Sequence, residues 1–143
     1  MRSPGSSGER LEAEFGGRAA DKKQLARAID AAVTGCVKRH VFVPSGRCVY
    51  TVVGSNADEF IDPDKLSCTC ESYFYGVLGN KVKRCYHLLS YEIASESDLV
   101  RQVSFEDEEY DTFVKLLAAD VLRSRELGRA RERPKVYRVG ILR

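Results

Sequence analysis

Three cysteines and one histidine have a spacing that strongly constrains what this chain can fold into. Cys68 and Cys70 form a C-x-C pair, fourteen residues follow, and Cys85 and His87 form a C-x-H pair. Thiolate sulfur and imidazole nitrogen are ligands that Zn²⁺ prefers, and four of them complete its tetrahedral coordination. A closed set leaves no position for a substrate, so the spacing predicts one structural zinc ion.

The two pairs predict different local backbones. Residues two apart on an extended strand point to the same side, so Cys68 and Cys70 can reach one ion. On a helix the same separation directs side chains apart, so we expect Cys85 just before a helix and His87 in its first turn. The motif at 66–93 is therefore predicted to be a strand-turn-helix clasp. Basic residues that could offset the charge of three thiolates come just before Cys85: Lys81, Lys83 and Arg84.

Length and cysteine usage indicate one domain in a reducing, intracellular compartment. The 143 residues fit a single compact domain, and the N-terminal residues lack the apolar core of a signal peptide. No apolar run approaches the roughly twenty residues of a membrane span. Five cysteines is an odd number, which argues against a disulfide framework. We expect the two cysteines outside the motif, Cys36 and Cys48, to be packed free thiols.

The hydrophobic pattern predicts an α+β fold with a small antiparallel sheet of three or four strands and flanking helices. Asp21 and Gln24 resemble a capping box that opens a helix over 22–36. Period-two runs around a Pro-Ser-Gly turn predict strands near 41–43 and 49–53, and a shorter strand is expected at 60–61. Further helices are expected over 87–95 and 107–125.

Composition divides the chain into three parts. Residues 1–20 are predicted to be a flexible leader, 21–127 the zinc domain, and 128–143 a basic tail. Charge is uneven: 92–111 holds eight acidic residues and one basic residue, whereas 121–143 holds eight basic and two acidic residues. This uneven distribution, an acidic segment and a basic tail, is a better indication of possible partners than the net charge of +2.

C-x-C, an insert and C-x-H is the signature of the SWIM zinc-finger family, which this chain resembles. The Tyr50-x-Val52 strand, Ile61 before the first cysteine, and Leu88-Leu89 after the histidine are similar too. The aromatic insert after Cys70 resembles the SWIM subunits of Shu recombination-mediator complexes. This resemblance implies an adaptor, not an enzyme, that works with a RecA-like recombinase paralogue in homologous recombination and DNA repair. The family commonly has a basic residue between the last two ligands, where this chain has a tyrosine at position 86.

A second interpretation is direct DNA binding through the basic tail, including Arg129, Arg131, Arg133 and Lys135, together with the basic residues near the zinc site. An enzyme is a third, but the sequence contains no Ser/His/Asp set or phosphate loop, and we expect no small-molecule substrate and no membrane partner. In the aromatic insert, we expect Phe74 to pack beneath the clasp and Tyr73 to be exposed as an anchor for a partner. His40 is expected in a strand, where it could contact phosphate.

Overall fold

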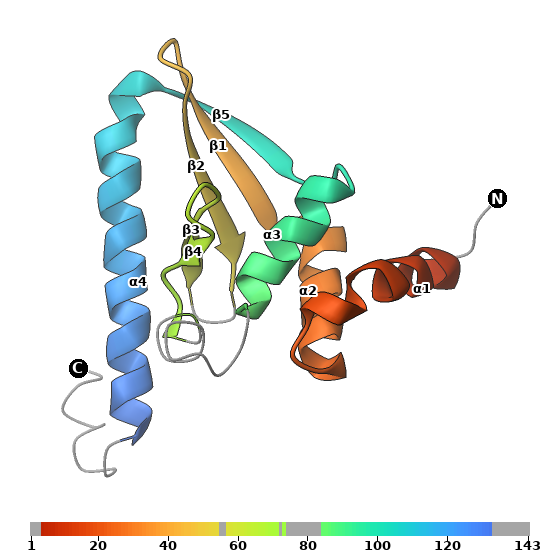
Figure 1. Ribbon diagram of the computed structural model, residues 1–143. Coiled ribbons are helices and arrows are strands. Elements are labelled where there is room, and N and C mark those ends of the chain that lie inside the picture. The colour runs from red at the N-terminus through yellow and green to blue at the C-terminus, as the bar shows by residue number, and fades with distance from the viewer. Residues whose placement is uncertain (1–3, 55–56, 72, 74–83, 133–143) are drawn as a thin grey trace.

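The structure is a computed structural model, and it describes residues 4–54, 57–71, 73 and 84–132 (Figure 1). Its α-helices are α1 (Pro4–Phe15), α2 (Lys22–Val33), α3 (Tyr86–Glu96) and α4 (Tyr110–Glu132). Its strands are β1 (Val37–Val43), β2 (Arg47–Val53), β3 (Asp58–Asp62), β4 (Ser67–Cys68) and β5 (Arg101–Glu106). Short 3-10 helices, η1 (Gly16–Arg18) and η3 (Asp107–Glu109), follow α1 and precede α4.

The five strands form one mixed sheet in the order β4-β3-β2-β1-β5. The first four strands along the chain pair antiparallel, as expected from the hairpin pattern. β5 instead runs parallel to β1, with His40 opposite Val103. The α+β class is therefore confirmed, but the expectation of a purely antiparallel sheet is wrong, because the chain returns through α3 before it adds its last strand.

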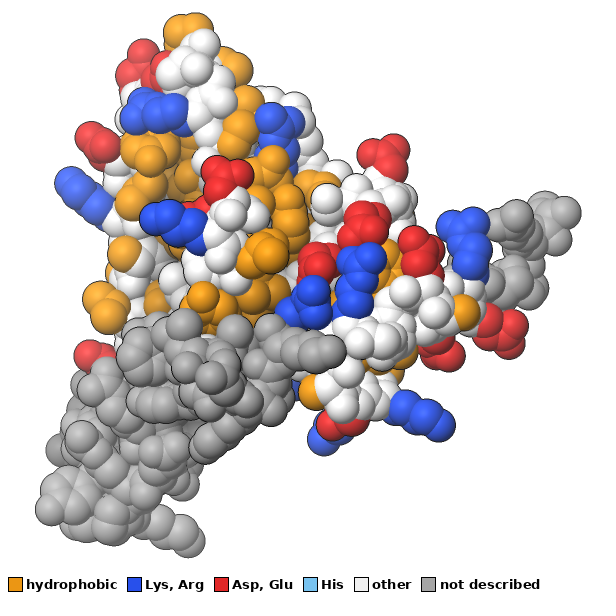
Figure 2. All heavy atoms as spheres, viewed as in Figure 1, with side chains coloured by type: hydrophobic (Ala, Val, Ile, Leu, Met, Phe, Trp, Pro, Cys, Tyr) orange, Lys and Arg blue, Asp and Glu red, His pale blue; other side chains and the backbone are white. Residues whose placement is uncertain are grey.

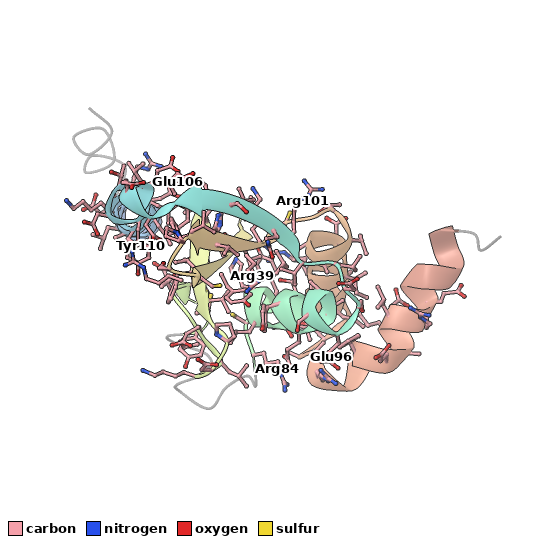
Figure 3. The ribbon with its side chains drawn as sticks, turned by 90° about the horizontal axis from the view of Figure 1, so that it is seen from above. Arg39, Arg84, Glu96, Arg101, Glu106 and Tyr110 are labelled. Carbon is pink, nitrogen blue, oxygen red and sulfur yellow. The ribbon has the colours of Figure 1, made fainter. Side chains whose placement is uncertain are left out.

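Helices cover both faces of the sheet (Figure 1). Side chains alternate along β1, so Val37 belongs to the core cluster that also includes residues of α2 and α3. His40 and Phe42 point to the other face, where both rings contact Phe113 of α4. Seen from above, the strands lie between α4 on one side and α2 with α3 on the other (Figure 3). The molecule thus has three layers.

Residues 4–20 are not the flexible leader that the sequence suggested. Residues 4–15 form α1, whose Leu11 and Phe15 are buried in the core cluster with α2 and α3. The Arg18 guanidinium lies 4.8 Å from the centre of the Phe15 ring and forms an ion pair with Glu96 at the end of α3. Two buried apolar side chains are enough to dock this helix, although the segment is rich in glycine and serine.

Asp21 is the N-cap of α2, as the sequence suggested, but only half of the expected capping box forms, because the Gln24 side chain bonds to the residue before the N-cap rather than to Asp21 itself. The Asp21 side chain accepts a hydrogen bond from the Gln24 N–H at 2.8 Å, and the Gln24 side chain accepts one from the Ala20 N–H at 2.7 Å. The helix ends at Val33, earlier than predicted, so Cys36 lies outside it and is half-buried. Cys48 is exposed on β2, so the expectation that both free thiols are packed in the interior is wrong for this residue.

α4 is longer than predicted and includes the first residues of the expected basic tail. It begins after the acidic turn of η3 and continues to Glu132, while residues 133–143 of the tail lie outside the described part of the chain. No helix among the described residues is both long enough and apolar enough to cross a bilayer.

Candidate metal centre

The four residues that the spacing singled out come together in one cluster. Cys68, Cys70, Cys85 and His87 are all buried, and their candidate ligand atoms lie within 4.8 Å of one another. A tetrahedral zinc ion with Zn–S bonds of about 2.3 Å separates its sulfur ligands by about 3.8 Å. The observed set is therefore close to the geometry that one ion requires.

The edge of the sheet positions the C-x-C pair. β4 pairs with β3 so that Cys68 lies opposite Ile61. One residue further on, the Thr69 N–H donates to the Phe60 carbonyl at 3.1 Å, and its hydroxyl donates to the Glu59 carboxylate at 2.6 Å. Only Cys68 is part of the regular strand, and Cys70 follows it. The strand expected through both cysteines is therefore confirmed only at Cys68.

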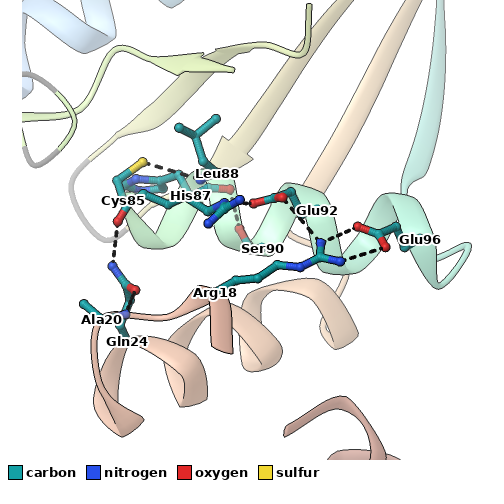
Figure 4. Close-up of polar contacts among 10 residues, drawn as sticks. Arg18, Ala20, Gln24, Cys85, His87, Leu88, Ser90, Glu92 and Glu96 are labelled. Carbon is teal, nitrogen blue, oxygen red and sulfur yellow. Dashed lines mark hydrogen bonds and ion pairs between the residues drawn. The ribbon is translucent and has the colours of Figure 1, made fainter. Parts of the chain in front are cut away.

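The start of α3 positions the C-x-H pair as predicted. Cys85 is the N-cap of the helix, and its sulfur accepts a hydrogen bond from the Leu88 N–H at 3.4 Å (Figure 4). His87 is the second helical residue. The sulfur therefore lies at the positive end of the helix dipole, which stabilises a thiolate.

Hydrogen bonding makes the cluster a favourable place for negative charge on sulfur. Hydrogen bonds from the thiols of Cys68 and Cys70 are the largest cause that lowers the pKa of Cys85 to about 4, and the N–H of Leu88 acts in the same direction. The hydrogen bonds that Cys68 makes with Cys70 and Cys85 raise the pKa of Cys68, because its proton is held between sulfur atoms. In addition, the Tyr73 N–H donates to the Cys70 sulfur at 3.3 Å. These donors favour the thiolate form that metal binding requires.

The imidazole of His87 provides a test of whether a metal fits. Its Nδ1 atom is buried and has no hydrogen-bond partner among the described residues. A buried nitrogen without a partner is costly, and coordination to a cation would satisfy it.

The Tyr86 ring centre lies 4.0 Å from that of His87, and the Arg27 guanidinium lies 4.0 Å above Tyr86. α2 therefore supplies a positive charge next to the ring that packs on His87.

Gly54 is a site residue that the sequence analysis did not identify. A Cβ atom at this position would lie 2.7 Å from the Ala57 carbonyl oxygen and 3.1 Å from Nε2 of His87. The sequence alone gives no signal for this role, because the approach of Gly54 to the histidine depends on the tertiary fold.

Arg84 does not have the role expected of it. Its guanidinium forms an ion pair with Glu92 of α3 rather than a contact with the sulfurs. Its carbonyl oxygen accepts a hydrogen bond from the Gln24 side chain at 2.8 Å, which ties the segment before Cys85 to α2. The other two basic residues of the expected set, Lys81 and Lys83, lie outside the described residues.

The aromatic insert is described only at Tyr73. This side chain is half-buried and packs against the core cluster, so the prediction that it turns away from the domain is wrong. Phe74, which we expected beneath the clasp, lies outside the described residues. His40 is buried and forms a hydrogen bond with Thr51 at 3.0 Å, which leaves its ring unavailable to a phosphate.

A comparison with protein-family models, curated proteins and solved structures finds no match to this chain. The geometry of the cluster and the spacing of the motif are therefore what indicates its function. The donor set fits a metal: three sulfurs and one imidazole nitrogen, all buried and all near one point.

Proposed function

We propose that Cys68, Cys70, Cys85 and His87 bind one structural Zn²⁺ ion that pins β4 to the start of α3. The observation that carries this proposal is the buried convergence of these donors within 4.8 Å, with an unpartnered imidazole nitrogen among them. Three soft sulfurs and one imidazole favour zinc over harder cations such as Mg²⁺ or Ca²⁺. Four protein ligands also fill the tetrahedral shell, which supports a structural role over a catalytic one.

Zinc content of the purified protein tests the metal proposal. We expect one zinc per chain by elemental analysis of the parent protein and almost none after Cys85→Ser. Cys48→Ser is the matched control, because Cys48 is an exposed cysteine outside the cluster. Full zinc content in the Cys85 variant would contradict the assignment.

We further propose that the domain is a SWIM-type adaptor for a RecA-like recombinase paralogue in homologous recombination. Support comes from the C-x-C and C-x-H motif with its flanking residues, and from a metal site that uses all its ligands for folding. Binding of DNA by the chain itself is the weaker candidate, because Arg84, the described member of the three basic residues expected near the zinc site, is paired with Glu92.

Co-expression with each RecA-like protein of the same organism tests the adaptor proposal. We expect a paralogue to co-purify with the chain at equal stoichiometry, whereas the main recombinase, used as the matched control, does not. A chain that binds no paralogue but shifts labelled DNA with a steep salt dependence would favour the DNA-binding alternative.

A further inference from the structure

One edge of the sheet has no partner strand. β5 is the last strand in the sheet order, and it pairs with β1 over all six of its residues without a bulge. Among the described residues no strand pairs with its other side, and Figure 3 shows β5 along one border of the molecule. Alternate residues of an edge strand direct their N–H and C=O groups outward, so β5 offers backbone groups that a further strand can pair with.

The opposite edge of the sheet is protected, whereas β5 is not. β4 consists only of Ser67–Cys68, and so short an edge gives a partner strand little to pair with. Longer edge strands commonly carry a lysine, a proline or a bulge that prevents pairing, and β5 has none of these. The four residues between Arg101 and Glu106 are uncharged, and two of them, Val103 and Phe105, are of types that favour strands.

The packing of the helices leaves this edge accessible. α3 packs against β1, β2, β3 and β4, and α4 packs against β3. Phe113 of α4 reaches the Phe105 ring, but the side chains at positions 101, 102 and 104 are exposed. Hydrophobic side chains gather over the sheet and α4, whereas charged side chains lie over α2 and α3 (Figure 2). The sheet side of the molecule is therefore the more suitable one for a protein contact.

A hydrogen bond within the chain limits how much of the edge a partner can use. The Glu106 N–H donates to the Glu109 carboxylate at 2.8 Å, as part of a capping box before α4. The segment left for pairing runs from Arg101 to Phe105, and Val103 is its central residue. If the strand pairs with a copy of itself over this whole segment, the symmetry axis passes through Val103.

We propose that β5 pairs antiparallel with β5 of a second copy of the chain about a two-fold axis at Val103, which joins the two sheets into one. In this register Val103 lies opposite the same residue of the other copy. Gln102 then lies opposite Ser104, and Arg101 lies opposite Phe105, once on each side of the axis. A two-fold contact requires a surface that is complementary to itself.

On the face of the joined sheet that α4 covers, the opposing side chains are compatible. Phe105 packs on Phe113 of α4, and side chains alternate along a strand, so Arg101 and Val103 share this face with Phe105. Two valines therefore meet on the axis, which is a favourable cross-strand pair. At each end a guanidinium lies beside an aromatic ring, where a cation is attracted to the ring face.

On the other face, Gln102 is already oriented by a neighbour. The Arg39 guanidinium donates to its Oε1 atom at 2.7 Å. The amide nitrogen of Gln102 is then directed away from Arg39, and it can donate to the exposed Ser104 hydroxyl of the second copy.

These side chains favour an antiparallel second copy over a strand of unrelated sequence. The backbone of an edge strand accepts many extended segments, but β5 itself carries an apolar, a polar and an aromatic residue at the spacing that its own side chains require. Parallel pairing in register would instead place Arg101 beside a second arginine and Glu106 beside a second glutamate, which is unfavourable.

The mass of the full-length protein in solution tests the proposal. We expect a monomer–dimer equilibrium by analytical ultracentrifugation, and Val103→Lys should raise the dimer dissociation constant at least about tenfold, because it places two cations opposite each other on the axis. Val43→Lys is the matched control: Val43 is 40% exposed on β1, which lies inside the sheet, so the dissociation constant should not change. Thermal melts of the dilute variants show whether both monomers are folded.

Cross-linking tests the register separately, in a chain whose free thiols outside the cluster are removed by Cys36→Ser and Cys48→Ser. Opposite residues of an antiparallel pair have Cβ atoms about 5 Å apart, close enough for a disulfide after a small adjustment. Val103→Cys should therefore form a covalent dimer under mild oxidation at least about tenfold faster than Ser104→Cys, whose counterpart lies two positions out of register.

A protein that stays monomeric at its highest soluble concentration would overturn the proposal. A Val103→Lys protein that is folded and dimerises as well as the parent would overturn it equally, and so would a Ser104→Cys protein that cross-links as fast as Val103→Cys. If Val103→Lys is unfolded, the two cross-linking rates decide. None of these measurements depends on zinc or on binding to a recombinase paralogue.

Discussion

Gly54 leaves no room for a side chain beside His87 of the candidate metal cluster. A Cβ atom there would lie 2.7 Å from a backbone oxygen, which cannot move without disturbing the turn after β2. We therefore predict that Gly54→Ala destabilises the protein by about 1–3 kcal/mol through overpacking and also weakens zinc binding, because the imidazole must shift. Thermal melts and zinc competition with a chelator measure the two effects.

Gly17→Ala is the matched control for that variant. A Cβ atom at Gly17 meets nothing within 4 Å, so the melting temperature and the zinc affinity should stay near those of the parent. Parent-like zinc affinity in Gly54→Ala would show that the histidine does not depend on this close approach.

His40 makes the stability of the α4 layer depend on pH. Burial is the largest cause that lowers the pKa of this imidazole below its usual value of 6.5, and nearby Lys38 acts in the same direction. The unfolded chain therefore takes up a proton as the pH falls through about 6.5, while the folded chain does so only at lower pH. We predict that the free energy of unfolding decreases on acidification through this window. The loss of stability that His40 causes should be complete once the pH is below the pKa of His40 in the folded state.

Denaturant unfolding of zinc-loaded protein at several pH values checks this prediction. His40→Gln serves as the comparison, since glutamine is a neutral polar residue that does not titrate. The difference in unfolding free energy between parent and variant should change with pH in the window below about 6.5. A constant difference would rule out His40 as the source.

At the scale of residues, the cluster of three cysteines and one histidine could be predicted because the chemistry and the spacing of these residues are both local properties of the sequence. The environments of Gly54, His40 and Tyr73 could not be predicted from the sequence. Each depends on which element packs beside it, and neither residue type nor spacing contains that information.

At the scale of elements, α1 is the clearest departure from the prediction. Phe15 is completely buried where α1 meets the rest of the core. We predict that Phe15→Ala destabilises the protein by about 3–5 kcal/mol, the usual cost of removing a buried phenylalanine ring. Urea unfolding measures this cost, and Glu12→Ala, an exposed change on the same helix, should be nearly neutral. If both variants unfolded with the same free energy as the parent, the segment would instead behave as a flexible leader.

The elements with strong local signals were predicted, and those without them were missed. The start of α2 follows from its N-capping aspartate, and the start of α3 from the C-x-H spacing before an apolar run. β5 was missed because its inward residues, Val103 and Phe105, lie within an acidic segment and its pairing with β1 is distant in sequence. α1 was missed because only two apolar residues mark its buried side.

At the scale of the whole molecule, the metal centre is part of the main core. Cys68, Cys70 and Cys85 belong to the same buried cluster as Phe15 of α1 and the apolar residues of α2 and α3. The ligands come from the sheet edge and from α3, so an ion would join two layers of the molecule. The aromatic contacts around Phe113 form a second packed region on the opposite face, between the sheet and α4.

This arrangement leads to a prediction for metal removal. The free energy of binding at structural zinc sites is largely folding free energy, on the order of 10 kcal/mol or more in small zinc peptides. We therefore predict that a strong chelator lowers the melting temperature of the whole domain and that added zinc restores it. Hydrogen exchange should show the largest loss of protection in β3, β4 and α3, because these elements surround the ligands, and a smaller loss in β1, which pairs with strands on both sides. Identical melting curves with and without chelator, on protein shown by elemental analysis to have lost its metal, would mean that packing alone holds the two layers together.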